Sequence, residues 1–167
     1  MFWEHLGRAV ATFWYLEYVL TRAIFAFTAT RRYPEVEIQA AFDKWLPTLE
    51  RALRDPLGNL IDSYAKAVRD HPSTTPPNFD ELLLQLREAS TLRNVLCHAC
   101  WNAPGSDGRS LPIFVNNRMM VFDTVIDTAY LTQTQRGTAE LSCDVITSVT
   151  HLGWRFPGFD GPRKPVY

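Results

Sequence analysis

An apolar and aromatic segment at the N-terminus, richest between Ala9 and Ala29, places the strongest constraint on the fold. Its apolar residues recur at helical spacing, and we expect one helix from about Phe2 to about Thr30. Glu17 and Arg22 lie near its middle, where charged side chains are costly inside a bilayer, so we expect a core helix and no membrane span. The apolar stripe consists of Phe13, Leu20, Ile24 and Phe27.

Length and charge narrow the class of protein. A chain of 167 residues can bury the core of one domain. Its formal charge of −1 excludes the broad cationic surface that non-specific duplex binding needs, so any contact with nucleic acid must be local. Three cysteines are an odd number and no signal peptide is evident, which favours reduced thiols and a cytoplasmic location.

The middle of the chain also has helical patterns. The stretch Tyr33 to Asp70 contains three prolines, of which Pro47 and Pro56 each remove a backbone donor, so we expect a kink or two shorter helices. Asn78 with Glu81 resembles a helix N-cap with a capping-box partner. The helix that they begin should run to about Trp101.

The C-terminal third changes pattern. Apolar residues alternate around the turn Asn116-Asn117, which predicts a β-hairpin over about 110–123. Asp127 or Thr128 can cap a last helix, which Gly153 ends. We therefore expect an all-α, up-and-down bundle of four to five helices with one inserted hairpin over 1–153. The Pro- and Gly-rich tail over 154–167 would be held to the body by Phe156 and Phe159.

Reactive side chains concentrate near the end of the third long helix. Asn94 and His98 are at i and i+4, so the amide can orient the imidazole. Arg93 and His98 are five residues apart, about 140° around the helix axis. Because they diverge, we expect a site that forms where two copies of the helix meet across a two-fold axis.

A groove of guanidinium groups and imidazoles suits a phosphodiester. One His98 would deprotonate a ribose 2′-hydroxyl, the other would protonate the leaving oxygen, and Arg93 would stabilise charge on phosphorus. This reaction needs no metal and no cofactor.

The segment Arg93 to His98, with Ala99 and Trp101 after it, resembles the R-polar-x3-H signature of the HEPN superfamily in its RNxxxHxxW form. The resemblance implies an α-helical homodimer that cleaves RNA without a metal, often in toxin, defence or RNA-processing settings. It implies catalytic roles for Arg93 and His98 and a supporting role for Asn94. The sequence does not identify the RNA, an antitoxin or another operon partner.

Two other interpretations stay open. An arginine and a histidine at this spacing also arise by chance, with the helix-terminal histidine binding carbonyls or solvent. Many HEPN-like domains bind RNA or protein without cutting, so the alternative is a non-catalytic RNA-binding or interaction module.

Glu17 lies on the apolar stripe of the first helix and must be paired or protonated. Arg93 is the partner expected if the two helices pack together, and Glu17 would then orient it. The alternative is a surface pair with Arg22 or Arg8, worth under about 1 kcal/mol.

Cysteines allow a zinc hypothesis. Cys97 and Cys100 share a helix face, and Cys143 or His151 would complete a tetrahedron. There is no second closely spaced ligand pair, so we expect free buried thiols and no metal.

Aromatic side chains surround the first helix on nearly all sides, which one face of a monomeric bundle does not require. A homodimer would cover part of this surface, and the alternative is a first helix central in the bundle. These residues are Phe2, Trp3, Trp14, Tyr15, Tyr18, Phe25 and Phe27.

Overall fold

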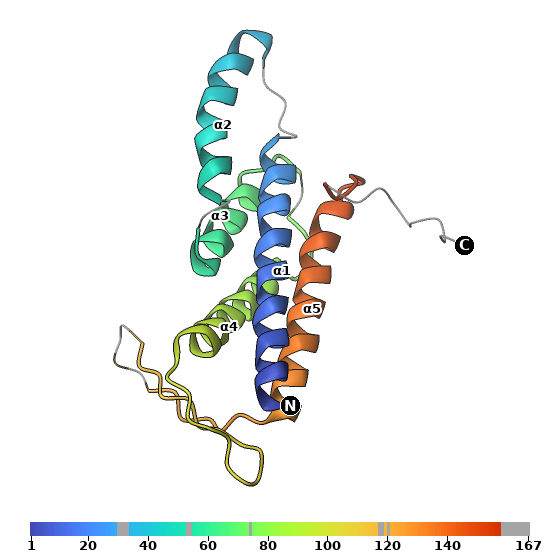
Figure 1. Ribbon diagram of the computed structural model, residues 1–167. Helices are drawn as coiled ribbons and strands as arrows, with labels where there is room; N and C mark the ends of the chain where they lie inside the picture. The colour runs from blue at the N-terminus through green and yellow to red at the C-terminus, as the bar shows by residue number, and fades with distance from the viewer. Residues whose placement is uncertain (30–33, 53–54, 74, 117–118, 120, 158–167) are drawn as a thin grey trace, which may run out of the picture.

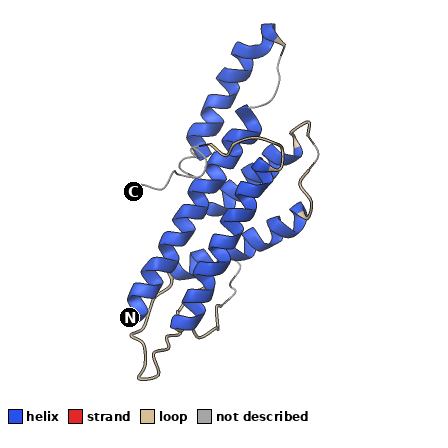
Figure 2. Ribbon diagram, turned by 90° about the vertical axis from the view of Figure 1, so that its right-hand side faces the viewer, coloured by secondary structure: helices blue, strands red, loops and turns tan. Residues whose placement is uncertain are grey.

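The computed structural model describes residues 1–29, 34–52, 55–73, 75–116, 119 and 121–157. Within these ranges the chain forms five α-helices and one 3-10 turn, and no strand, which confirms the all-α class (Figures 1 and 2). The elements are α1 (Phe2–Ala29), η1 (Glu35–Glu37), α2 (Ile38–Ala52), α3 (Leu57–Arg69), α4 (Phe79–His98) and α5 (Thr128–Thr150). No helix in the described ranges is long and apolar enough to cross a membrane.

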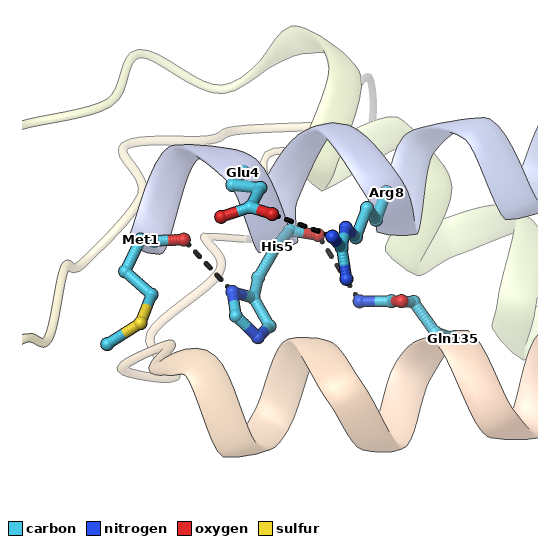
Figure 3. A network of polar contacts seen from close by, with 5 residues as sticks. All are labelled: Met1, Glu4, His5, Arg8 and Gln135. Atoms are coloured by element: carbon cyan, nitrogen blue, oxygen red, sulfur yellow. Dashed lines mark hydrogen bonds and ion pairs between the residues drawn. The ribbon is translucent and has the colours of Figure 1, made fainter.

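Helix α1 organises the packing, because it contacts each of the other four α-helices. It lies alongside α5 and runs in the same direction (Figure 1). The two helices are joined near their N-terminal ends, where Gln135 Nε2 donates to the His5 carbonyl at 3.4 Å (Figure 3). All four residues of the predicted α1 stripe are buried, as expected for a core helix: Phe13, Leu20, Ile24 and Phe27.

Prolines separate the second and third helices as predicted. Pro56 directly precedes α3 at its N-cap, and α2 and α3 are two short helices rather than one. Pro47 lies inside α2, where a proline removes one backbone donor without ending the helix. Tyr64 of α3 is fully buried, and its hydroxyl lies 2.6 Å from Ser148 Oγ of α5.

The predicted capping box at the start of α4 is wrong. Asn78 has φ 57° and ψ 25°, and its side chain makes no cap hydrogen bond. An N-cap side chain reaches the first turn from an extended backbone, and the left-handed conformation of Asn78 does not provide that geometry. The helix also ends at His98 rather than at Trp101, because Ala99 turns to an extended conformation.

The connection from α4 to α5 carries isolated bridges instead of the paired strands expected over 110–123. In its described part Cys100 pairs with Ile113, Ser110 with Ile126 and Val115 with Val121, all antiparallel. Val115 and Val121 do pair across the predicted turn, and the Phe122 amide donates to the Phe114 carbonyl at 3.0 Å, but each bridge is single and no strand forms in the described part. Residues 117, 118 and 120 of the predicted hairpin lie outside the described residues.

The last helix begins as predicted. Asp127 caps α5 by accepting a hydrogen bond from the Tyr130 amide at 2.8 Å. Gly153, with φ 78°, follows its end in the left-handed region that favours glycine. Phe156 is buried and holds the start of the tail against the core, whereas Phe159 lies outside the described residues.

Candidate functional site

The end of α4 presents the polar side chains that the sequence singled out. Asn94 and His98 are exposed, whereas Arg93 turns inward and its side chain is 22% exposed. Trp101 lies just after α4, and its indole packs against Phe2 and Trp3 of α1. This contact holds the end of α4 against α1. The site is therefore built on the C-terminal turns of α4, supported from one side by α1.

Arg93 is the centre of this cluster. One of its terminal nitrogens, Nη1, lies 3.4 Å from Asn94 Oδ1 and 3.4 Å from His98 Nε2. The other, Nη2, lies 3.1 Å from Glu17 Oε1 of α1. One guanidinium group thus contacts all three of the other residues predicted for the site.

The divergence of Arg93 and His98 around the helix axis, from which a dimer site was predicted, does not keep their side chains apart. The two side chains leave the helix in different directions. The arginine side chain, however, is long and flexible enough to extend along the helix surface to the imidazole. His98 is also the last residue of α4, so no following helical turn lies between its imidazole and the guanidinium. A second protomer is not needed to bring these two groups together.

The predicted pair of Glu17 with Arg93 is confirmed. Both side chains are 22% exposed, which makes this a half-buried ion pair. Glu17 Oε1 is shielded from solvent, and its contact with Nη2 is a charge contact without aligned hydrogen-bond geometry. The alternative partners are engaged elsewhere: Arg8 donates to Glu4 at 2.7 Å (Figure 3), and the Arg22 guanidinium lies 4.6 Å from the Tyr18 ring centroid.

The contact with Arg93 involves Nε2 of His98. A guanidinium group can only donate, so a hydrogen bond at this 3.4 Å separation forms in the tautomer whose Nε2 carries no proton. A neutral imidazole is the form that can take a proton from a hydroxyl group.

Cys97 lies between the site residues in sequence and shares their electrostatic environment. Partial burial raises the pKa of its thiol, Arg93 acts in the opposite direction, and Glu17 raises it further. The thiol is therefore mainly protonated at neutral pH. This state disfavours a role as nucleophile or metal ligand.

The expectation of buried thiols is wrong, because all three cysteines are free and exposed. Cys97 and Cys100 lie at the end of α4, beyond the well-packed part of the helix, where the chain leaves the core. Across the described ranges, no three His, Cys, Asp or Glu side chains gather in a way that would hold a metal ion, the zinc alternative with Cys143 or His151 included.

A pocket of about 420 Å³ adjoins the cluster and was not foreseen from the sequence. Trp14, Tyr18 and Phe25 of α1 line it together with Glu17, which also contacts Arg93. The helical spacing of these residues indicates that they lie on one face of α1. The opposite wall of the pocket is formed by α2, α3 and the residues beside them. The sequence pattern did not indicate that these segments approach α1. That wall consists of Ala52, Asp55, Leu60 and Pro157.

Comparison of the chain with protein-family models, with curated proteins and with solved structures found no match in any of the three.

Proposed function

We propose that this protein is a HEPN-like endoribonuclease that cleaves RNA without a metal ion at the Arg93, Asn94 and His98 cluster. The observation that carries the proposal is the contact of one guanidinium group with both Asn94 Oδ1 and His98 Nε2 at 3.4 Å. The contact brings a guanidinium group beside an exposed imidazole, and these are groups that can serve phosphodiester transfer to a 2′-hydroxyl.

In the proposed reaction the Arg93 guanidinium moves from His98 Nε2 to the phosphate, and Nε2 then takes the proton of a ribose 2′-hydroxyl. The 2′-oxygen forms a bond to phosphorus, and the bond from phosphorus to the 5′-oxygen of the next nucleotide breaks. A protonated imidazole returns a proton to that 5′-oxygen, so the products are a 2′,3′-cyclic phosphate and a 5′-hydroxyl. Arg93 stabilises the negative charge that builds on the phosphoryl oxygens, while Asn94 and Glu17 hold Arg93 in position.

A homodimer would supply the second imidazole for this scheme. Trp3, 50% exposed, packs beside Trp101 at the end of α4, next to the exposed His98. A second copy docked at this end would cover the apolar surface and place its His98 opposite the first. Sedimentation velocity at micromolar concentration should then show a dimer that Trp3→Ala weakens, and a monomer would contradict this part of the proposal.

The second candidate function is a HEPN-like module that binds RNA or protein without cutting. The ion pair of Arg93 with Glu17 favours it, because the carboxylate already neutralises much of the positive charge that would face a phosphate. The same groove would then recognise a partner without driving the chemistry.

An RNA cleavage assay in the presence of EDTA distinguishes the two candidate functions. The purified protein should convert end-labelled single-stranded RNA into fragments with 2′,3′-cyclic phosphate ends, and His98→Ala and Arg93→Ala should each abolish cutting. His151→Ala, which removes an exposed histidine outside the cluster, should cut as fast as the original protein. Equal cutting by His98→Ala would overturn the site, and binding without cutting would favour the second function.

A further inference from the structure

The pocket beside the cluster has the composition of a nucleobase site. Trp14 and Tyr18 are stacked, with ring centroids 6.1 Å apart and planes inclined by 22°. Both line the pocket and both remain accessible, at 67% and 39% exposure. Exposed aromatic rings are a common platform for unpaired bases, because every base has a face that can stack.

The pocket lies between the side of α1, the end of α2 and the start of α3. Thr21 Oγ1 of α1 donates to the Glu17 carbonyl at 3.0 Å and approaches the Ala52 carbonyl at the end of α2 at 3.4 Å. Leu60 of α3 closes the apolar side. The resulting volume of about 420 Å³ lies within the range of small-molecule sites.

Charge on the pocket wall indicates which base would fit. The carboxylates of Glu17 and Asp55 line it and can only accept hydrogen bonds when ionised. Guanine presents two adjacent donors, N1–H and the N2 amino group, which match a carboxylate. The Arg22 guanidinium, 4.6 Å from the Tyr18 ring centroid, provides positive charge at the same pocket for the phosphate that follows the base.

We propose that this pocket binds an unpaired guanine of the RNA, stacked on Trp14, which Tyr18 supports, and hydrogen-bonded by Asp55, beside the bond to be cleaved. The position follows from Glu17, which lines the pocket and also contacts Arg93 at 3.1 Å. The inference rests on the proposed function, because it names the substrate feature that the same site recognises.

Binding of 2′-O-methyl RNA tests the pocket apart from the chemistry, since this RNA has no nucleophile and cannot be cut. The probes are two fluorescent single-stranded oligonucleotides, one of uridines only and one with a single central guanosine. Anisotropy should show binding of the guanosine probe about tenfold tighter, in the range that stacking of one base provides. Equal binding of the two probes, or no binding of either, would overturn the proposal.

Substitutions of the pocket residues test which side chains bind the guanosine. Trp14→Ala and Tyr18→Ala should each weaken binding of the guanosine probe about tenfold, while Trp14→Phe, which keeps a ring, should restore most of it. Asp55→Asn should remove the preference for guanosine. Phe42→Ala is the matched control, because the Phe42 ring is 48% exposed and packs against Trp45 but does not line the pocket; it should change binding by less than about twofold.

The two proposals fail separately. If unmodified RNA is cut but Trp14→Ala binds the 2′-O-methyl probe as tightly as the original protein, the pocket is overturned and the nuclease stands. If the probe binds through Trp14 and Asp55 but no RNA is cut, the base site stands and the cleavage proposal is overturned. Circular dichroism confirms that each variant remains folded.

Discussion

Arg93 on α4 and Glu17 on α1 form an ion pair of 3.1 Å between side chains that are each only 22% exposed. This pair joins α1, which contacts each of the other four α-helices, to the end of the helix that carries His98. Since the same guanidinium group also contacts His98 Nε2, a change in Glu17 should be transmitted to the imidazole. The pair therefore links the stability of the bundle to the geometry of the candidate site.

Replacing Glu17 with Gln should lower the free energy of unfolding by about 1–3 kcal/mol, because the half-buried Arg93 charge loses its counter-charge. Chemical denaturation measures the loss. Glu4→Gln is the matched control: it breaks the ion pair of Glu4 with Arg8, where both side chains are more than half exposed, and should cost under about 1 kcal/mol. Equal losses for the two variants would show that the Glu17 pair has no special role in stability.

The reactivity of Cys97 should report on the same ion pair. Alkylation requires the thiolate, and burial and Glu17 raise the pKa of this thiol while Arg93 lowers it. Glu17→Gln should therefore speed alkylation of Cys97 near neutral pH, and Arg93→Ala should slow it, each by less than about tenfold, or one pKa unit. Mass spectrometry of the modified peptide gives the rates. Changes of the same sign in both variants would contradict this electrostatic account.

The buried Tyr64 should make the protein sensitive to alkaline pH. Ser148 Oγ donates its single proton to the Val145 carbonyl at 2.7 Å, so Tyr64 is the donor in its contact with Ser148. Burial raises the pKa of Tyr64 far above its ordinary value of 10.0. The stabilising contribution of the neutral phenol is complete below pH 10 and is lost as the pH rises from there towards the folded-state pKa.

Thermal unfolding followed between neutral pH and the alkaline range tests this prediction. Tyr64→Phe should flatten the alkaline decline and cost about 1 kcal/mol near neutral pH through the lost hydrogen bond. Tyr15→Phe, which removes an exposed hydroxyl, should leave the whole curve unchanged. An alkaline decline that is identical in Tyr64→Phe would assign it to other groups.

The N-cap residues of α4 and α5, Asn78 and Asp127, should respond differently to substitution. Asp127→Ala removes the side chain that accepts from the Tyr130 amide and should cost about 1 kcal/mol. Asn78→Gly removes a side chain that makes no cap hydrogen bond and suits the backbone at φ 57°, so stability should stay the same or rise slightly. Denaturant midpoints for both variants measure the contrast, and a large loss from Asn78→Gly would contradict it.

Local pattern was sufficient for the helices and for part of the site. The apolar spacing of the first segment predicted α1 closely, and Pro56 and Asp127 marked helix starts, because these signals act within one or two turns of chain. Glu17 on an apolar stripe also indicated a buried partner, and Arg93 is that partner. A carboxylate leaving water needs a counter-charge, and few cations were available on the facing helix.

Tertiary structure decided the remaining features. Whether Asn78 caps its helix depends on a left-handed backbone, and the bridges of Cys100 with Ile113 and of Ser110 with Ile126 join residues more than ten positions apart, which local alternation does not indicate. The reach of Arg93 to His98 depends on where α4 ends, and the pocket beside Trp14 exists only because α2 and α3 return to α1. Periodicity in a sequence reports the faces of single helices, whereas clefts and side-chain contacts arise from how several helices meet.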